Sequence, residues 1–423
     1  MQDVVQSAPA VPADTLREAL ELYRQLHANP ELSGAEERTA AAFADGLRHA
    51  GFTVTTGVGG HGVVGRLTNG DGPTVLLRAE LDALAVAEQT GLPYASTAVA
   101  PGPRGDAVPV MHACGHDLHL ASLAGAARVL SEDRDGWRGT VLAVGQPAEE
   151  TLHGATAMLD DGLYTRWGRP DVALAQHCAP LPAGMVAHGP LMTASSITLE
   201  ITISGRGGHI ATPRHCDDPV VTAALIVMQL QTVRAQHTDP TEPAGLTVGQ
   251  LTAGTSPNVV ADSATLGVTM RAYSPAALTR MREAVERITR AACAAAESPG
   301  EPRIRVVAQS PSNTPDPAVT ARLRDAHRQA FGNARVADWP PSLATEDFPH
   351  YTTDGVPTGY WMLGVIGPAQ WRSVSGDPAT RIARLPGNHS PQFAPYAALA
   401  LPTGIQALTA ATHAWLRRSD ATR

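Results

Sequence analysis

The chain has 423 residues, of which 43% are hydrophobic and 17% are charged, and its formal net charge is -8. This composition is typical of a globular protein, and the length favours about two domains. No basic run indicates a nucleic acid or an anionic membrane as partner, and no apolar run is long enough to span a bilayer.

Cysteine usage and the start of the chain bear on its compartment. Four cysteines in a chain of this length do not form a disulfide framework. Residues 1–15, MQDVVQSAPAVPADT, lack the basic and apolar regions of a signal peptide. We therefore expect a soluble, cytoplasmic protein in a reducing compartment, where a free thiolate is available as a metal ligand.

An α/β pattern opens the chain. Helices are predicted near 14–27 and 35–50, and Asp14 or Thr15 is expected to cap the first of them. Continuous apolar runs of strand length follow, with a helix among them, and such runs are typical of strands buried on both faces of a sheet. The runs are TVLLRAEL (74–81), TVLAVG (140–145) and DVALAQH (171–177), and the helix is SLAGAARVLSE (122–132).

The pattern changes after about Pro190. SITLEITIS (196–204) alternates strictly between apolar and polar residues, as a strand does when only one face is buried. A helix, two strands, a second helix and a last strand follow, which is the β-α-β-β-α-β order of a ferredoxin-like α+β domain. These elements are expected near 217–234, 246–251, 263–272, from 274, and at 303–308. An open sheet face or edge favours contact with a second copy of the chain.

From about Asn313 the first pattern resumes, with a helix, a strand and a closing helix that are expected near 317–331, 359–365 and 396–417. We therefore predict one discontinuous α/β domain in two pieces, interrupted by a smaller inserted domain. The predicted boundaries are 1–190 and 313–423 for the α/β domain and 191–312 for the insert.

Metal-binding residue types recur where predicted strands end. Glu149 and Glu150 follow the run at 140–145, and His177 ends the run at 171–177. Sites in open α/β sheets gather beyond the carboxyl ends of the strands, so these side chains are expected in one crevice. Further candidates are Cys114 and His116, before the helix at 122–132, and His389 from the second piece of the α/β domain.

This mixed set of sulfur, nitrogen and oxygen ligands favours zinc. It is larger than one closed tetrahedral site needs, and two ions that share a bridging ligand would use it fully. A pair of metal ions can hold a bridging hydroxide and polarise a substrate carbonyl. The adjacent glutamates then suggest that one binds metal and the other handles the proton.

A series of short motifs, in order over nearly the whole chain, resembles the zinc amidohydrolases. That family includes hippurate hydrolase, the N-acyl-amino-acid amidohydrolases (aminoacylases) and the plant auxin-conjugate hydrolases. Each motif alone is a weak signal, but the ordered series is specific. The motifs are LHANPELSGAEERT, LLRAELDAL, MHACGHD, QPAEE, AQHCAP, GRGGHIATP, DPVV, GTSPNVVAD, TEDF and NHSPQF.

The resemblance implies a zinc-peptidase-like catalytic domain with a lid or dimerisation insert, and it implies roles for single residues. Cys114 would be the metal-bridging thiolate, and Glu149 would be the general base that takes a proton from the attacking water. The other implied metal ligands are His116, Glu150, His177 and His389.

Four further roles follow from the same resemblance. His209 would reach the active site of a second subunit and stabilise the oxyanion, which implies a homodimer. Asn258 and Arg271 would hold the carbonyl or carboxylate of the substrate. Asp82 would orient a ligand histidine.

The chain departs from the family pattern at Glu80, where relatives have Asp, at Ala85, where they have Pro, and at Arg214, where many have a second His. The stretch between Val365 and His389 is long. These departures bear on the acyl group and the leaving amine, and they remove no predicted ligand.

Other interpretations of single residues stay open at this point. Cys114 taken alone also fits a small buried hydrophobe, and the pair Glu149 and Glu150 also fits the solvated start of a helix. Asp117 is expected to cap the following helix or to orient a histidine. The residues expected to serve packing, support or bracing are His27, His112, His119, Cys178, Cys216, Cys293, Glu346 and Asp347.

The sequence therefore predicts a metal-dependent amidohydrolase that cleaves N-acyl amino acids or related N-acyl amines with a bridging hydroxide. The expected cofactors are two divalent ions, zinc first and manganese, cobalt or nickel as alternatives. A dipeptidase or carboxypeptidase of the same superfamily and a non-catalytic metal-binding homologue are the alternative functions. A zinc deaminase is excluded because its His-x-Glu and Pro-Cys-x-x-Cys elements are absent from the sequence.

Overall fold

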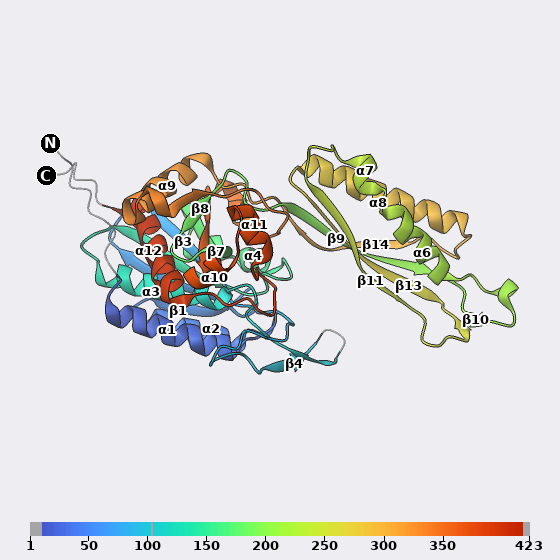
Figure 1. The fold of residues 1–423 in the computed structure, drawn as a ribbon, viewed down its shortest axis with the longest axis horizontal. Helices are drawn as coiled ribbons and strands as arrows, with labels where there is room; N and C mark the ends of the chain where they lie inside the picture. The colour runs from blue at the N-terminus through green and yellow to red at the C-terminus, as the bar shows by residue number, and fades with distance from the viewer. Residues whose placement is uncertain (1–10, 103–104, 418–423) are drawn as a thin grey trace. The chain divides into compact units, whose positions relative to one another are not determined.

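The computed structural model describes residues 11–102 and 105–417, so the part of the signal-peptide prediction that falls on residues 1–10 lies outside the described residues. The chain divides into two compact units, drawn in Figure 1. The first unit contains Met1–Met192, Pro315–Pro340 and His350–Arg423, and the second contains Thr193–Thr314 and Pro341–Pro349.

A mixed sheet of eight strands forms the centre of the first unit, in the order β1-β2-β6-β3-β7-β16-β8-β15. Its middle strands β6, β3, β7 and β16 are parallel, whereas β1 and β2 form an antiparallel hairpin at one edge. The strands are β1 (Thr53–Val58), β2 (Gly62–Asn69), β3 (Thr74–Glu80), β6 (Gly139–Gln146), β7 (Val172–Pro182), β8 (Val186–His188), β15 (Val336–Asp338) and β16 (Thr358–Ile366). β4 (Val99–Pro101) and β5 (Ala107–Pro109) form a separate pair.

The strands predicted from continuous apolar runs are confirmed, and their burial explains why they are readable in the sequence. Every residue of β6 and β16 is buried, and so is β3 after its first residue. Strands buried on both faces need continuous apolar runs. The hairpin of β1 and β2 was not predicted, because its residues are glycine-rich and partly exposed at the sheet edge.

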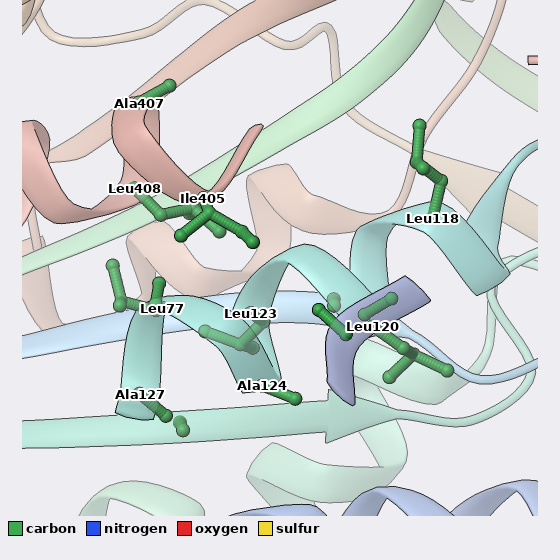
Figure 2. Close-up of a cluster of buried hydrophobic side chains, with 14 of the residues drawn as sticks. Leu77, Leu118, Leu120, Leu123, Ala124, Ala127, Ile405, Ala407 and Leu408 are labelled. Carbon is green, nitrogen blue, oxygen red and sulfur yellow. The ribbon is translucent and has the colours of Figure 1, made fainter. Parts of the chain in front are cut away.

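Helices cover this sheet, and α3 is the most deeply buried of them. α3 packs against α1, α12 and β3. Figure 2 shows Leu118, Leu120 and Leu123 of α3 in the cluster that also holds Ile405 of α12 and Leu77 of β3. The helices of the first unit are α1 (Ala13–Ala28), α2 (Glu37–His49), α3 (His116–Glu132), α4 (Gly154–Asp160), α5 (Leu163–Trp167), α9 (Pro317–Phe331), α10 (Pro368–Ser373), α11 (Pro378–Arg384) and α12 (Ala397–Leu416).

The predicted cap of the first helix is wrong. α1 begins at Ala13 with Pro12 at the cap position, and no side chain of the described residues caps it. Asp14 instead pairs with Arg17 one turn further on, at 2.7 Å. Proline has no side-chain acceptor, so among the described residues this helix begins without a hydroxyl or carboxylate cap.

The second unit is built on an antiparallel sheet with the order β11-β13-β9-β14. In β9, Leu199, Ile201 and Ile203 are fully buried while the residues between them are partly exposed, as the alternating pattern predicted. Figure 1 shows the helices α6, α7 and α8 on one face of this sheet. The strands are β9 (Ser195–Ser204), β11 (Ala244–Ala253), β13 (Ser263–Ala272) and β14 (Arg303–Ser310).

One helix predicted in the second unit is two helices. The range 217–234 contains α6 (Pro219–Leu230) and the start of α7 (Val233–His237), and α8 spans Pro275–Ala295. A short ladder pairs β10 (Gly208–His209) with β12 (Val259–Val260). Among the described helices of both units, none combines the length and apolar character needed to cross a membrane.

Candidate metal and catalytic site

The predicted ligands of the first unit come from four separate segments. Cys114 and His116 lie at the start of α3, where Gly115 adopts a positive φ of 86°. A Cβ at Gly115 would lie 2.9 Å from the Sγ of Cys178, so this turn needs glycine both for its backbone angle and for space. Glu150 follows β6.

His177 and His389 complete this set. His177 lies inside β7, which continues to Pro182, so the prediction that the strand ends at His177 is wrong. His389 lies in the loop before α12 and adopts a positive φ of 67°.

These residues converge although up to 275 positions separate them in the chain. The Sγ of Cys114 lies 3.5 Å from the Nε2 of His177, and the Nε2 of His389 lies 3.3 Å from the Oε1 of Glu150. The ligand atoms form overlapping groups within which all atoms lie within 4.8 Å of one another. Three of the groups are Cys114, His116 and His177; Cys114, Glu150 and His389; and His116, Glu149 and Glu150.

The donor atoms of this group fit divalent cations. The Nε2 of His116 and the Oε1 of Glu150 are buried and have no hydrogen-bond partner among the described residues. Burying polar atoms without a hydrogen bond costs free energy, which a bound cation would offset. Thiolate, imidazole and carboxylate together suit zinc and neighbouring transition metals.

Burial and nearby charge shift the protonation of these groups. Burial raises the pKa of the Cys114 thiol well above its usual value, and the negative charges of Glu150 and Glu149 raise it further. Burial lowers the pKa of His177 to about 3, so its ring is neutral and keeps a lone pair that can bind a metal ion.

His116 has the opposite shift. Burial lowers its pKa, but the charges of Glu80 and Asp82 outweigh burial and raise the pKa to about 10. A cation at a ring nitrogen displaces the proton there, and a cation beside a thiol deprotonates it. Metal binding at His116 and Cys114 would therefore release protons.

Asp82 contacts the Nδ1 of His116 and so fixes the orientation of its ring. The Nδ1 of His116 lies 2.9 Å from the backbone O of Asp82 and 3.3 Å from its Oδ1, which leaves Nε2 directed toward the other ligands. The Oδ2 of Asp82 accepts hydrogen bonds from the Oγ of Ser33 at 2.7 Å and from the backbone N of Glu150 at 2.9 Å. One buried carboxylate thus holds two of the segments together.

Two buried networks around α3 were not predicted as such. In the first, the Nε2 of His119 accepts from the backbone N of Cys178 at 2.8 Å, so its Nδ1 carries the proton. This Nδ1 donates to the Oε2 of Glu80 at 2.7 Å, and Glu80 also pairs with Arg78. The network fixes β7 next to His177. The only sequence signal was the position of His119, one helical turn after His116.

The second network joins α1 to α3. The Oδ2 of Asp117 lies 2.7 Å from the Nδ1 of His27, and the Nε2 of His27 lies 3.1 Å from the Oε1 of Glu88. All three side chains are fully buried. Asp117 therefore orients a histidine, which was one of the two roles predicted for it. It is not the cap of α3, because Gly115 occupies that position.

Three predicted residues belong to the second unit. His209 lies in β10 and is exposed, and its Nδ1 accepts from the backbone N of Ala211 at 3.0 Å. Asn258 precedes β12, and its Oδ1 accepts from the Oγ of Ser256 at 2.5 Å. Arg271 lies in β13 and donates to the backbone O of Leu343 at 2.9 Å.

Known proteins resemble the chain over most of its length. The model of peptidase family M20/M25/M40 matches residues 76–386. An N-acetyl-L-cysteine deacetylase of Bacillus subtilis is 32% identical over 84% of this chain and 82% of its own length. A hippurate hydrolase of Campylobacter jejuni is 34% identical over 77% of this chain and 82% of its own length.

A plant relative and a solved structure add to this comparison. An IAA-amino acid hydrolase (ILR1-like 2) of Arabidopsis thaliana is 30% identical over 86% of this chain and 80% of its own length. A solved structure of a dinuclear metal-binding peptidase of family M20 from Bacillus subtilis is 25% identical. It covers 95% of this chain and 98% of its own, with a TM-score of 0.70.

Proposed function

Because the chain belongs to peptidase family M20/M25/M40, we propose that it is an amidohydrolase that cleaves the amide bond of N-acyl amino acids with two divalent cations, zinc first among them. The chain is an enzyme of the deacetylase and hydrolase type after which its relatives are named. The resemblance predicted from the sequence is thereby confirmed.

One observation carries the proposal, the convergence of five ligand side chains from four segments of the first unit. Cys114 belongs both to the group with His177 and to the group with His389, so its sulfur would help to hold both cations. The remaining ligands are His116 and Glu150. When bound, the cations would polarise the substrate carbonyl and lower the pKa of water.

The two glutamates differ in their neighbours, which supports different roles for them. The Oε1 of Glu150 lies 3.3 Å from the Nε2 of His389 and belongs to a group with Cys114, so Glu150 is the ligand. The Oε2 of Glu149 lies 3.9 Å from the Nε2 of His116. Glu149 is the general base, whose carboxylate takes the proton from the attacking water and delivers it to the leaving amine.

The second unit supplies the remaining roles in this proposal. His209 stabilises the oxyanion in the active site of a second subunit, and Asn258 and Arg271 hold the carbonyl or carboxylate of the substrate. Residues 191–312 act as a ferredoxin-like lid and dimerisation domain, and 1–190 with 313–423 as the catalytic domain. His209 is exposed and lies in the short ladder of β10 with β12, and both features support a role outside its own unit.

The apolar face of α6 supports the dimer. Val221, Leu225 and Met228 recur at helical spacing and have exposed fractions of 57%, 51% and 72%. Exposed apolar residues in such a row mark interaction surfaces. A cytoplasmic location stays part of the proposal, and the four free cysteines support it.

Hydrolysis of a substrate panel, with the metal content measured on the same sample, tests the proposal. The panel contains acetyl, benzoyl, long-chain and indole-acetyl amino acids beside unblocked dipeptides. We expect turnover of at least one N-acyl amino acid, loss of turnover after chelation, and recovery when zinc is restored. Turnover of dipeptides alone would favour a dipeptidase, and undiminished turnover by metal-free protein would refute the metal mechanism.

A further inference from the structure

Asn388, the residue before His389, reaches the other segments that hold proposed ligands. Its Nδ2 lies 3.2 Å from the backbone O of Cys114 and 3.2 Å from the backbone O of Cys178, the neighbour of His177. The same nitrogen lies 3.6 Å from the Sγ of Cys114. The side chain of Asn388 therefore contacts the segments of Cys114 and His177, and the peptide bond links Asn388 to His389.

The acceptors around Asn388 determine the orientation of its side-chain amide. Carbonyl oxygens only accept hydrogen bonds, so the NH₂ end of Asn388 must face Cys114 and Cys178. Its two hydrogens are shared among three acceptors, the two carbonyl oxygens at 3.2 Å and the Cys114 sulfur at 3.6 Å, so one hydrogen takes part in a three-centre bond. The opposite orientation would place the amide oxygen against two carbonyl oxygens.

The backbone of His389 explains why such an anchor matters. His389 has a φ of 67°, a conformation that costs a non-glycine residue on the order of 1 kcal/mol. Its side chain is 54% exposed, so burial does not hold it in place. Its backbone N donates to the O of Ala113 at 2.7 Å, and the amide of Asn388 provides the adjacent anchor.

From this geometry we propose that Asn388 is a positioning residue that clamps the segments of Cys114, His177 and His389 and donates a hydrogen bond to the Cys114 sulfur. The inference rests on the proposed function, because it takes Cys114 and His389 as metal ligands. Partners behind metal ligands fix ligand orientation, and their loss weakens metal affinity by about 10- to 100-fold. A hydrogen bond to a thiolate also reduces the electron density that the sulfur donates to a metal.

Cobalt binding to the metal-free protein tests this role without any activity measurement. Co²⁺ is titrated into the full-length wild type and into the variants Asn388→Leu and Asn388→Ala, and the sulfur-to-cobalt charge-transfer absorption is recorded. Ser390→Ala is the matched control, because Ser390 lies in the same loop and, within the described part of the chain, its Oγ accepts only a local hydrogen bond, from the backbone N of Gln392 at 3.2 Å. Circular dichroism of the metal-free proteins checks folding.

We expect both Asn388 variants to fold, to bind at least one equivalent of Co²⁺ about 10- to 100-fold more weakly, and to show a shifted sulfur band. Ser390→Ala should match the wild type. The inference fails if the Asn388 variants titrate and absorb like the wild type, or if both are unfolded, since that would assign Asn388 to fold stability. A wild type that binds Co²⁺ without a sulfur band would instead refute Cys114 as a ligand and the proposed site with it.

Discussion

Each proposed ligand depends on a neighbour that sets its protonation and direction. Asp82 directs the Nε2 of His116 toward the other ligands, and burial keeps the ring of His177 neutral. Without metal, Cys114 is a thiol because burial, and then the charges of Glu150 and Glu149, raise its pKa. Burial lowers the pKa of His116, but the charges of Glu80 and Asp82 outweigh burial and raise it. Metal affinity is therefore expected to fall as the pH falls, since protons compete for the same atoms.

Glu149→Gln tests the division of labour between the two glutamates. The amide keeps the size of the side chain but cannot accept the proton, so kcat is expected to fall about 10²- to 10⁴-fold. Metal content, measured by mass spectrometry of the purified protein, should stay equal to that of the wild type. Glu21→Gln on the exposed face of α1 is the control, and a fully active Glu149→Gln enzyme would contradict the assigned role.

The buried ion pairs of His27 make a prediction about stability and pH. Burial lowers the pKa of His27, but hydrogen bonds to Asp117 and Glu88 outweigh burial and raise the pKa to about 10. The stabilisation is thus fully present below the unfolded pKa of about 6.5 and is lost as the pH rises through about 10. His27→Gln should destabilise the first unit by about 3–5 kcal/mol at pH 6, and by much less near pH 10.

Urea unfolding of the metal-free protein, followed by tryptophan fluorescence, measures this difference. All six tryptophans belong to the first unit, so the signal reports on the unit that holds His27. His49→Gln at the exposed end of α2 should show no such pH dependence. A His27→Gln defect that is constant from pH 6 to pH 10 would rule out the ion-pair explanation.

The start of α3 is the element that brings Cys114 and His116 to the site. Gly115 allows this start, because it has a positive φ and lies against the side chain of Cys178. The sequence predicted a helix at 122–132, but α3 begins at His116. Its first turn is rich in histidine and aspartate, which read as loop until their tertiary partners are known.

A comparison of Gly115→Ala with Gly34→Ala separates the need for a positive φ at Gly115 from the need for space beside Cys178. Gly34 has a similar φ of 81°, but a Cβ there would meet no atom of the described residues within 4 Å. Gly34→Ala should therefore cost only the backbone strain, about 1 kcal/mol. Gly115→Ala should cost more and should also weaken Co²⁺ binding, measured by urea unfolding and cobalt titration. Equal costs would show that contact with Cys178 is unimportant.

At the scale of the whole molecule, the dimer proposal concerns the second unit. Leu225→Glu places a charge on the exposed apolar face of α6 and is expected to convert a dimer to a monomer in light scattering. Activity should fall when dimerisation is lost, because His209 is proposed to act in the partner's active site. Val99→Glu is the control, since Val99 is 65% exposed but lies in β4 of the first unit. A monomeric wild type with full activity would contradict the shared site.

Local pattern alone was enough for the parallel strands, the helices α9 and α12, and the alternation in β9, because burial dictates which residues those elements contain. The ordered motifs were enough to identify the family and to nominate the ligands. The sequence carried no sign of the clamp at Asn388, and it offered a histidine as a partner for Asp117 without indicating that this histidine is His27. Those contacts join residues 274 and 90 positions apart, and only the folded chain brings such distant residues together.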